Sequence, residues 1–200
     1  MRSPRPRGRD LAVPGPGAAG AAGGGAVPGS LEQYTVAVWQ PAYIGLGSNL
    51  QDPREQVLRG CAALEGLVAT RLVQISPLYR SKPLGPVPQP DFINAVAAVL
   101  TQLDPRKLLD ELLGIERALG RPAEHERWGP RIIDLDLLIH GRERREEPGL
   151  TLPHPGIVER NFVLYPLGDL APDLDVPGLG PVAELKGRLA PLGLERLGEP

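Results

Sequence analysis

The chain has 200 residues, of which 42% are hydrophobic, and this length suits one ordinary domain with a packed core. Its formal net charge of −2 gives no overall attraction to nucleic acid or to an anionic membrane. Because Cys61 is the single cysteine, an intramolecular disulfide and a cysteine-based metal cage are excluded. No apolar run reaches the ~18 residues of a membrane span, so we expect a cytoplasmic protein.

The amino-terminal segment differs in composition from the rest of the chain. Residues 1–30 contain eight glycines, five prolines and six alanines, without a periodic apolar face. Such a segment buries too little apolar surface to become ordered, so we predict a disordered tail over residues 1–33. The folded domain is then expected over residues 34–200, and the tail is interpreted as a dispensable extension.

The first half of the domain alternates strand and helix signals. The sequences TVAVW and AYIGLGS favour a strand that ends at residues 47–49. Asp52 and Pro53 then predict the start of a helix, with aspartate as N-cap and proline in the first turn. The apolar face of this helix is expected to comprise Val57, Leu58, Cys61 and Leu64. A second strand is predicted over residues 71–80.

A stiff loop and a second strand–helix–strand unit follow. Residues 81–90 contain four prolines and one glycine, which predicts a loop. A third strand is predicted over residues 91–102. Asp104 begins a second helix, and Gly120 ends it. A fourth strand is predicted over residues 132–140.

The order of these elements is βαββαβ. This order indicates an α+β protein with a ferredoxin-like core, in which an antiparallel sheet carries both helices on one face. The remaining sequence predicts a charged turn over residues 141–149, followed by a C-terminal extension with a loop, a short helix and a packed tail.

Two aspartates interrupt the most apolar segment of the chain, RWGPRIIDLDLLIHG. Strand alternation places Ile132, Asp134, Asp136 and Leu138 on one face and Ile133, Leu135, Leu137 and Ile139 on the face toward the helices. Two carboxylates about 7 Å apart in backbone register repel unless they are solvated or a cation lies between them. A solvent-facing strand is the alternative explanation. Mg²⁺ characteristically uses such carboxylates together with substrate phosphates.

The residues before this strand favour the metal explanation. Arg121, Arg127 and Arg131 occur within eleven residues, and guanidinium groups neutralise charge in phosphoryl transfer. The chain contains no P-loop sequence and no protein-kinase signature.

Aromatic residues suggest a site for a flat ring. Phe92 and Asn94 are two residues apart in the third strand, so they share a face. A ring and an amide side by side can stack on a heterocycle and bind its edge, although ordinary packing also explains the pair. Phe162 and Trp128 provide two further rings.

Four segments together resemble one family. YIGLGSNL, SPLYRSKPLGPVPQPDFINAV, RWGPRIIDLDLLIHG and LTLPHPGIVERNFVLYPL are similar to motifs of the 6-hydroxymethyl-7,8-dihydropterin pyrophosphokinases, over about residues 42–174. The resemblance implies a diphosphotransferase of tetrahydrofolate biosynthesis that moves pyrophosphate from ATP to a pterin alcohol and releases AMP. It also implies two Mg²⁺ ions, ATP as co-substrate, and a monomer with a single function.

The resemblance implies roles for individual residues. Asp134 and Asp136 would bind the two Mg²⁺ ions and, with Arg121 and Arg131, form the catalytic set. The pterin would be bound by Ser81, Lys82, Leu84, Phe92, Asn94, Trp128 and Phe162. ATP would be bound by Glu116, Arg121, Arg131, His154 and Arg160. Gly47, Ser48 and Asn49 would support the pocket floor.

The sequence departs from the family pattern at two of these places. Ala123 occupies a loop position where relatives commonly carry arginine, and Arg127 is expected to replace part of the missing charge. Phe92 stands where many relatives have tyrosine, so stacking is kept while a phenol hydrogen bond is lost.

Two other functions fit the residues less well. A ferredoxin-like RNA-binding module would expose aromatic residues on a basic sheet, whereas this chain is 4% aromatic with a net negative charge. A metal-dependent phosphodiesterase or nuclease usually needs more carboxylate or histidine ligands. We therefore expect small-molecule partners, with no nucleic acid and no membrane.

Overall fold

The computed structural model of the chain describes residues 38–122 and 129–200. The predicted tail over residues 1–33 lies outside the described residues, as do Ala123, Arg127 and Trp128. The described residues all belong to one compact unit, Ala37–Pro200.

The described unit combines helices and strands, as predicted. Its elements are β1 (Gln40–Ser48), α1 (Pro53–Glu65), β2 (Thr70–Ile75), β3 (Leu78–Ser81), β4 (Phe92–Thr101), α2 (Pro105–Ala118), β5 (Asp134–His140), β6 (Arg145–Glu147), β7 (Leu150–Leu152), the 3₁₀ helix η1 (Pro155–Ile157), α3 (Asn161–Leu170), β8 (Asp175–Val176), β9 (Gly180–Pro181), α4 (Val182–Arg188) and β10 (Leu194–Gly198).

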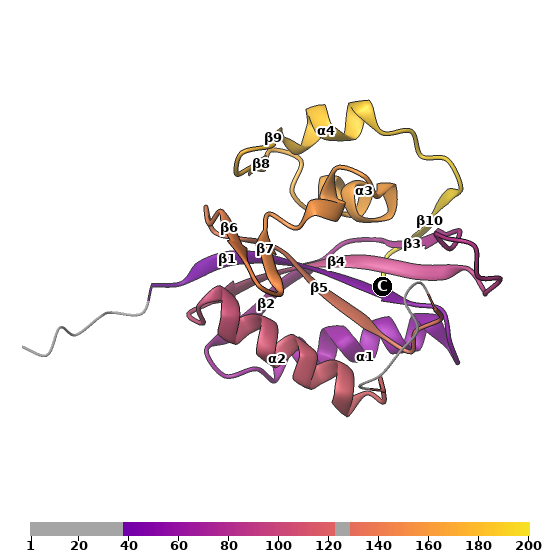
Figure 1. The fold of residues 1–200 in the computed structure, drawn as a ribbon, viewed down its shortest axis with the longest axis horizontal. Helices are drawn as coiled ribbons and strands as arrows, with labels where there is room; N and C mark the ends of the chain where they lie inside the picture. Colours follow the sequence, from indigo (N-terminus) through magenta and orange to yellow (C-terminus); the bar gives the residue numbers. More distant parts are fainter. Residues whose placement is uncertain (1–37, 123–128) are drawn as a thin grey trace, which may run out of the picture. The chain divides into compact units, whose positions relative to one another are not determined.

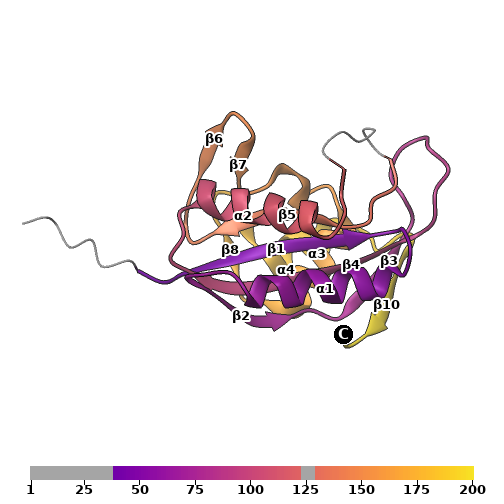
Figure 2. The same ribbon diagram turned by 90° about the horizontal axis from the view of Figure 1, so that it is seen from below.

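One antiparallel sheet organises this unit. Its strands follow the order β10-β3-β4-β1-β5, and β2 also pairs with β4. Helices α1 and α2 cover one face, while α3 lies on the other face and α4 packs on α3 (Figures 1 and 2). The predicted α+β class, the antiparallel sheet and the shared face of the first two helices are confirmed.

The predicted helix boundaries follow from capping. Asp52 accepts a hydrogen bond from the backbone N–H of Glu55 at 3.2 Å, and α1 begins with proline. Asp104 caps α2 in the same way. Each carboxylate satisfies donors that the first helical turn leaves without partners. Gly120 follows α2 with a φ of +97°, a conformation that glycine adopts without steric cost.

Three local predictions differ from the structure. The strand predicted over residues 71–80 is divided at Ser76 and Pro77, because proline has no N–H to donate to the sheet. The Ser76 hydroxyl replaces part of the lost pairing by accepting from the Val96 N–H at 2.9 Å. The region predicted as a charged turn and a loop contains the hairpin of β6 and β7. In addition, β1 begins at Gln40, so Val38 and Trp39 of the expected first strand precede it.

The predicted alternation along the fourth strand holds only in part. Ile133, Leu135 and Leu137 pack in the core on the α1 and α2 side, as expected. Ile139 instead packs with Leu138 in the second core, on the α3 side. The ladder between β1 and β5 shifts register between Tyr43 and Ile44, and such a bulge reverses the faces of the residues beyond it. The strand also begins at Asp134, so Ile132 and Ile133 precede it.

Asp169 connects the C-terminal extension to the sheet. Its carboxylate accepts from the Tyr79 hydroxyl at 2.6 Å and from Lys186 Nζ and Arg196 Nε at 3.1 Å each. The cluster joins β3, α3, α4 and β10. Burial acts to raise the pKa of Asp169, but the hydrogen bonds from Tyr79, Lys186 and Arg196 outweigh it and hold this pKa below its ordinary value.

We expect Asp169→Asn to lower the free energy of unfolding by about 1–2 kcal/mol at pH 7, because three donors lose a charged acceptor. A carboxyl group whose folded-state pKa is depressed stabilises the fold above its unfolded pKa of about 3.9, and this contribution is lost as pH falls through the folded value. Urea denaturation at a series of pH values should therefore show the difference from wild type shrinking below about pH 4.

The exposed pair Arg80–Glu195 provides a control, because it also joins β3 to β10. Glu195→Gln should change the free energy of unfolding by less than about 1 kcal/mol. A stability difference for Asp169→Asn that stays constant down to pH 2 would contradict the assignment of the charge.

Candidate active site

A pocket opens on the α3 side of the sheet. Its walls come from β1, β3, β4, β5, the start of α3 and the loop after β3. Residues predicted for the site that line it are Ser81, Lys82, Leu84, Phe92, Asn94, Arg131, Asp134, Asp136, Arg160 and Phe162.

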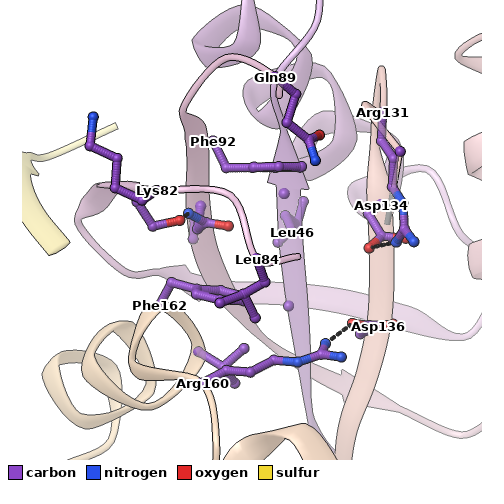
Figure 3. Close-up of a pocket in the computed structure, with 17 residues that line it drawn as sticks. Leu46, Lys82, Leu84, Gln89, Phe92, Arg131, Asp134, Asp136, Arg160 and Phe162 are labelled. Atoms are coloured by element: carbon purple, nitrogen blue, oxygen red, sulfur yellow. Dashed lines mark hydrogen bonds and ion pairs between the residues drawn. The ribbon is translucent and has the colours of Figure 1, made fainter. Parts of the chain in front are cut away.

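One part of the pocket is built to hold a flat ring. The side chains of Phe92 on β4 and Phe162 on α3 face each other across it (Figure 3). Two residues along β4 from Phe92, buried Asn94 donates from Nδ2 to the Ser81 hydroxyl of β3 at 2.9 Å. Two aromatic faces and a buried amide suit a heterocycle with a hydrogen-bonding edge.

Gly47 keeps the floor of this part open. A Cβ atom at this position would lie 3.2 Å from Asn94 Oδ1 and 4.0 Å from Phe92 Cδ1. A side chain at this position would therefore crowd the Asn94 amide, while its contact with the Phe92 ring would be an ordinary one. Its predicted place at the pocket floor agrees with the geometry.

The other part of the pocket carries charge. Asp134 accepts from Arg121 Nη1 at 2.6 Å and from Arg131 Nη1. Arg121 also donates to Glu116, which in turn accepts from the backbone N–H of Leu135 at 2.7 Å. Two guanidinium groups thus face two carboxylates, which limits the repulsion that an acidic strand end would otherwise create.

Glu116 lies behind the pocket and does not line it. Its side chain is 3% exposed. Burial raises the pKa of Glu116, while the hydrogen bond from Leu135 and the charge of Arg121 oppose the change. Its contacts make it a support for Arg121 and for the start of β5.

Asp136 has weaker partners than Asp134. Arg160 Nη1 lies 3.5 Å from Asp136 Oδ2 (Figure 3), and His154 Nε2 lies 4.0 Å from Oδ1. Burial raises the pKa of Asp136, and the charge of Asp134 acts in the same direction. Burial lowers the pKa of His154, against the charge of Asp136. Because His154 Nδ1 accepts from the Gly156 N–H at 3.0 Å, its neutral ring carries hydrogen on Nε2, toward Asp136.

The carboxylate pair suits a magnesium ion that shares its ligands with a substrate. Within residues 38–122 and 129–200, no group of three or more His, Cys, Asp and Glu side chains forms a metal cage. Asp134 and Asp136 both line the pocket, and Mg²⁺ commonly uses one or two carboxylates completed by phosphate oxygens. The donor set therefore fits Mg²⁺ delivered with a polyphosphate.

The predicted residues that line the pocket are named above, whereas Glu116, Arg121 and His154 reach it only through Asp134 or Asp136. Ser48 and Asn49, predicted at the pocket floor, are buried and do not line the pocket. The Asn49 side chain accepts from the Arg131 N–H at 2.7 Å and donates to Gln89 Oε1 at 2.9 Å. The prediction for Trp128 lies outside the described residues. Lining residues to which the sequence assigned no role are Gly45, Leu46, Gln89, Ala95, Gly129 and Val163. Gly45 could have been predicted, because it lies two residues from Gly47 and therefore faces the same side of β1. Gln89 could not, because its place in the pocket depends on the path of the loop between β3 and β4.

Known proteins share these features. The sequence profile of the 7,8-dihydro-6-hydroxymethylpterin-pyrophosphokinase (HPPK) family matches residues 43–172. A 2-amino-4-hydroxy-6-hydroxymethyldihydropteridine pyrophosphokinase of Pseudomonas aeruginosa is 50% identical over 79% of this chain and 97% of its own length. The protein of the same name from Haemophilus influenzae is 47% identical over 74% of this chain and 92% of its own.

The chain belongs to the HPPK family. It is therefore an enzyme of the diphosphotransferase class with ATP as co-substrate, as the sequence predicted. Among solved structures, wild-type HPPK-DHPS of Plasmodium falciparum aligns with a TM-score of 0.59 at 15% identity. The alignment covers 76% of this chain and 41% of that longer one. At this identity the likeness supports the fold alone.

The buried contacts of Glu116 with Arg121 and Leu135 predict that the protein loses stability when this carboxylate is removed. Glu116→Ala should lower the free energy of unfolding by about 1–3 kcal/mol, since it leaves the buried Leu135 N–H without its acceptor, while Arg121 keeps its contact with Asp134. Glu116→Gln keeps an oxygen for Leu135 and should cost at least about 1 kcal/mol less. Urea denaturation measures both, and equal losses in the two variants would exclude the hydrogen bond to Leu135 as the cause.

Proposed function

We propose that this protein transfers the pyrophosphoryl group of ATP to 6-hydroxymethyl-7,8-dihydropterin in folate biosynthesis, and that the pocket lined by Phe92, Phe162 and the carboxylate pair holds both substrates. The observation that carries the proposal is the placement of two facing aromatic rings and a carboxylate pair in one cavity. A pterin needs the first feature and a metal-bound polyphosphate needs the second.

The pterin lies between Phe92 and Phe162 in this proposal. Stacking on both faces fixes the plane of the ring, and Asn94 and Ser81 meet its polar edge. Leu84, which is 45% exposed at the pocket wall, covers the ring from the loop after β3. The hydroxymethyl group then points toward Asp134 and Asp136.

ATP lies on the charged side. Arg131 and Arg160 line the pocket and bind phosphate oxygens, while Arg121 and His154 support the same region from behind. When bound at Asp134 and Asp136, two Mg²⁺ ions would neutralise phosphate charge and make the pterin hydroxyl more acidic. The arginines compensate the charge that develops during transfer.

The reaction is a displacement at the β-phosphorus of ATP. The pterin hydroxymethyl oxygen forms a bond to this phosphorus, the bond to the α-phosphate oxygen breaks, and AMP leaves with the electron pair. The hydroxyl proton is lost to water. No side chain of the described pocket is assigned as a dedicated base, because His154 presents a donor toward Asp136. Positioning and charge compensation therefore account for the catalysis.

Several expectations remain predictions of this proposal: a monomer, a cytoplasmic location, ligands limited to small molecules, and a domain that begins near residue 34. In the part of the chain that the structure describes, no helix has the length and apolar character needed to cross a membrane.

Product analysis tests the reaction directly. Purified protein mixed with ATP, Mg²⁺ and 6-hydroxymethyl-7,8-dihydropterin should yield AMP and the pterin diphosphate in equal amounts, and a chelator should stop the reaction. Formation of ADP would keep a phosphotransferase but reject attack at the β-phosphorus. A well-folded protein that forms no nucleotide product would refute the proposed substrate pair.

Asp136→Ala tests the carboxylate pair. We expect kcat/KM to fall by about 10³-fold or more, because a metal ligand facing the transferred group is removed. The melting temperature should stay near the wild-type value, since Asp136 faces the pocket and not the core. Asp173→Ala, at an exposed carboxylate outside the pocket, provides the control. Near-wild-type turnover of Asp136→Ala would remove the metal-ligand assignment.

A further inference from the structure

Residues 189–198, which we call the C-terminal strap, connect α3 to the edge of the sheet. They lead away from α4 and end as β10, which pairs with β3 (Figure 1). On the way, the strap accepts two hydrogen bonds from one side chain of α3. The Asn161 amide donates from Nδ2 to the carbonyls of Ala190 and Leu192, at 3.1 and 3.0 Å. One segment is therefore bonded to a helix and to a strand that both line the pocket.

The two rings of the pocket lie next to the attachment points of the strap. Asn161 is the first residue of α3 and directly precedes Phe162. On the sheet, Leu194 of β10 is in register with Ser81 of β3, and Ser81 is in register with Phe92 of β4. The strap therefore links the backbone beside Phe162 to the part of the sheet that carries Phe92.

The first turn of α3 lacks two ordinary helix restraints. In the described part of the chain, its N-cap residue Arg160 makes no side-chain capping hydrogen bond. Pro166 lies inside the helix and has no N–H, so it cannot donate to the Phe162 carbonyl four residues earlier. Helix ends without such bonds fray easily. The two bonds from Asn161 to the strap therefore hold the turn that carries Phe162.

The strap also holds the opposite wall. The strand β3 spans four residues, and β10 pairs with the edge that β4 leaves free. The Lys82 N–H donates to the Gly193 carbonyl at 3.3 Å. Gly193 has a φ of +67°, a conformation that glycine adopts without steric cost and that turns the strap into β10. The Ser81 hydroxyl, which binds the Asn94 amide, is positioned by this pairing.

The charged side of the pocket is held by other contacts. The Arg160 N–H donates to the Gly156 carbonyl at 3.0 Å. The Arg160 side chain lies over Gly156, since an added Cβ there would be 2.9 Å from Arg160 Nε. Arg121 and Arg131 both donate to Asp134. Because these contacts do not involve the strap, a change in the strap should affect ring binding more than phosphate binding.

We propose that the C-terminal strap holds the spacing of the two rings that bind the pterin, and that Asn161 is the positioning residue through which it acts. Walls that are fixed before binding reduce the conformational entropy that is lost when a flat ring enters between them. The inference rests on the proposed function, since the ring bound between Phe92 and Phe162 is the pterin.

Asn161→Ala removes both donors to the strap. The pterin Kd, measured by fluorescence titration at saturating magnesium α,β-methylene-ATP, should rise about fivefold or more, because the Phe162 wall is less ordered before binding. The Kd of the nucleotide analogue, and kcat at saturating ATP and pterin, should stay within about twofold of wild type. Damage to the whole pocket would instead weaken both ligands and lower kcat.

Asn161→Asp separates the strap from the stability of the helix start. An aspartate in the first turn interacts favourably with the helix dipole. Its ionised carboxylate only accepts hydrogen bonds, however, and would repel the carbonyls of Ala190 and Leu192. This variant should therefore raise the pterin Kd at least as much as Asn161→Ala. If Asn161 only stabilised the start of α3, Asn161→Asp would bind the pterin as wild type does.

Gly193→Ala disturbs the strap at its other end. Alanine is disfavoured at this φ, and its Cβ would lie 3.4 Å from Lys82 Cγ. The pterin Kd should rise about threefold or more. Gly180→Ala is the matched control, because Gly180 in β9 has a φ of +96° and, in the described structure, an added Cβ meets nothing within 4 Å. It should leave the pterin Kd within about twofold of wild type.

Hydrogen exchange measured by mass spectrometry tests the strap without a ligand. In Asn161→Ala, the amides of residues 161–165 and of β3 should exchange about threefold faster or more than in wild type, because both segments lose a restraint. The amides of α1 and α2, on the other face of the sheet, should exchange at the wild-type rate. Unchanged exchange in residues 161–165 and β3 would contradict the strap.

The binding outcomes are distinct. The inference is overturned if the pterin Kd stays within twofold of wild type in both Asn161 variants, if pterin and nucleotide binding weaken equally, or if Gly180→Ala matches Gly193→Ala. If one Asn161 variant does not fold, the other and Gly193→Ala carry the test. Wild-type protein that forms AMP and pterin diphosphate, with Asn161 variants that bind the pterin normally, refutes the role of the strap alone. Wild-type protein that forms neither product refutes the proposed function itself.

Discussion

The architecture of the pocket depends on how the negative charges of Asp134 and Asp136, at the start of β5, are compensated. One face of this strand is buried by Leu135 and Leu137 against α1 and α2, so the opposite face must present Asp134 and Asp136 to the pocket. Asp134 is neutralised by guanidinium groups that arrive from both ends of the segment between α2 and β5. Without such partners, two neighbouring carboxylates in a partly buried site would repel each other and favour protonation.

The C-terminal extension completes the pocket. Arg160 and Phe162 lie at the start of α3. They add a cation and a second aromatic ring to the pocket walls that the ferredoxin-like core provides. Asp169 near the other end of α3 connects that helix to β3 and β10. The distance between the two aromatic rings thus depends on how α3 packs on the sheet. A core truncated after β5 would carry the carboxylates without the opposing wall.

Several local features of the fold could be predicted because their causes are local. The Asp-Pro pairs at 52–53 and 104–105 cap helices within one turn, and Gly120 ends a helix by its own backbone freedom. One error arose where a distant segment decides, because the β-bulge opposite Tyr43 moves Ile139 to the other core. The other errors are local: the strands of the β6–β7 hairpin have only three residues each, and Pro77 divides an apolar run that was predicted as one strand.

The sequence by itself determined the order of the strands and helices of the ferredoxin-like core, the family, and the residue types that the chemistry requires. Each of these can be recognised from short motifs, because their interpretation depends only on residues close in sequence. Tertiary structure alone decided which residues share the pocket, that Glu116 and Arg121 stand behind it, and that Asn49 joins its walls. The partners of the Asn49 amide are 40 to 82 residues away. Hydrogen bonds over such separations arise from packing of the whole domain, so no local pattern can encode them.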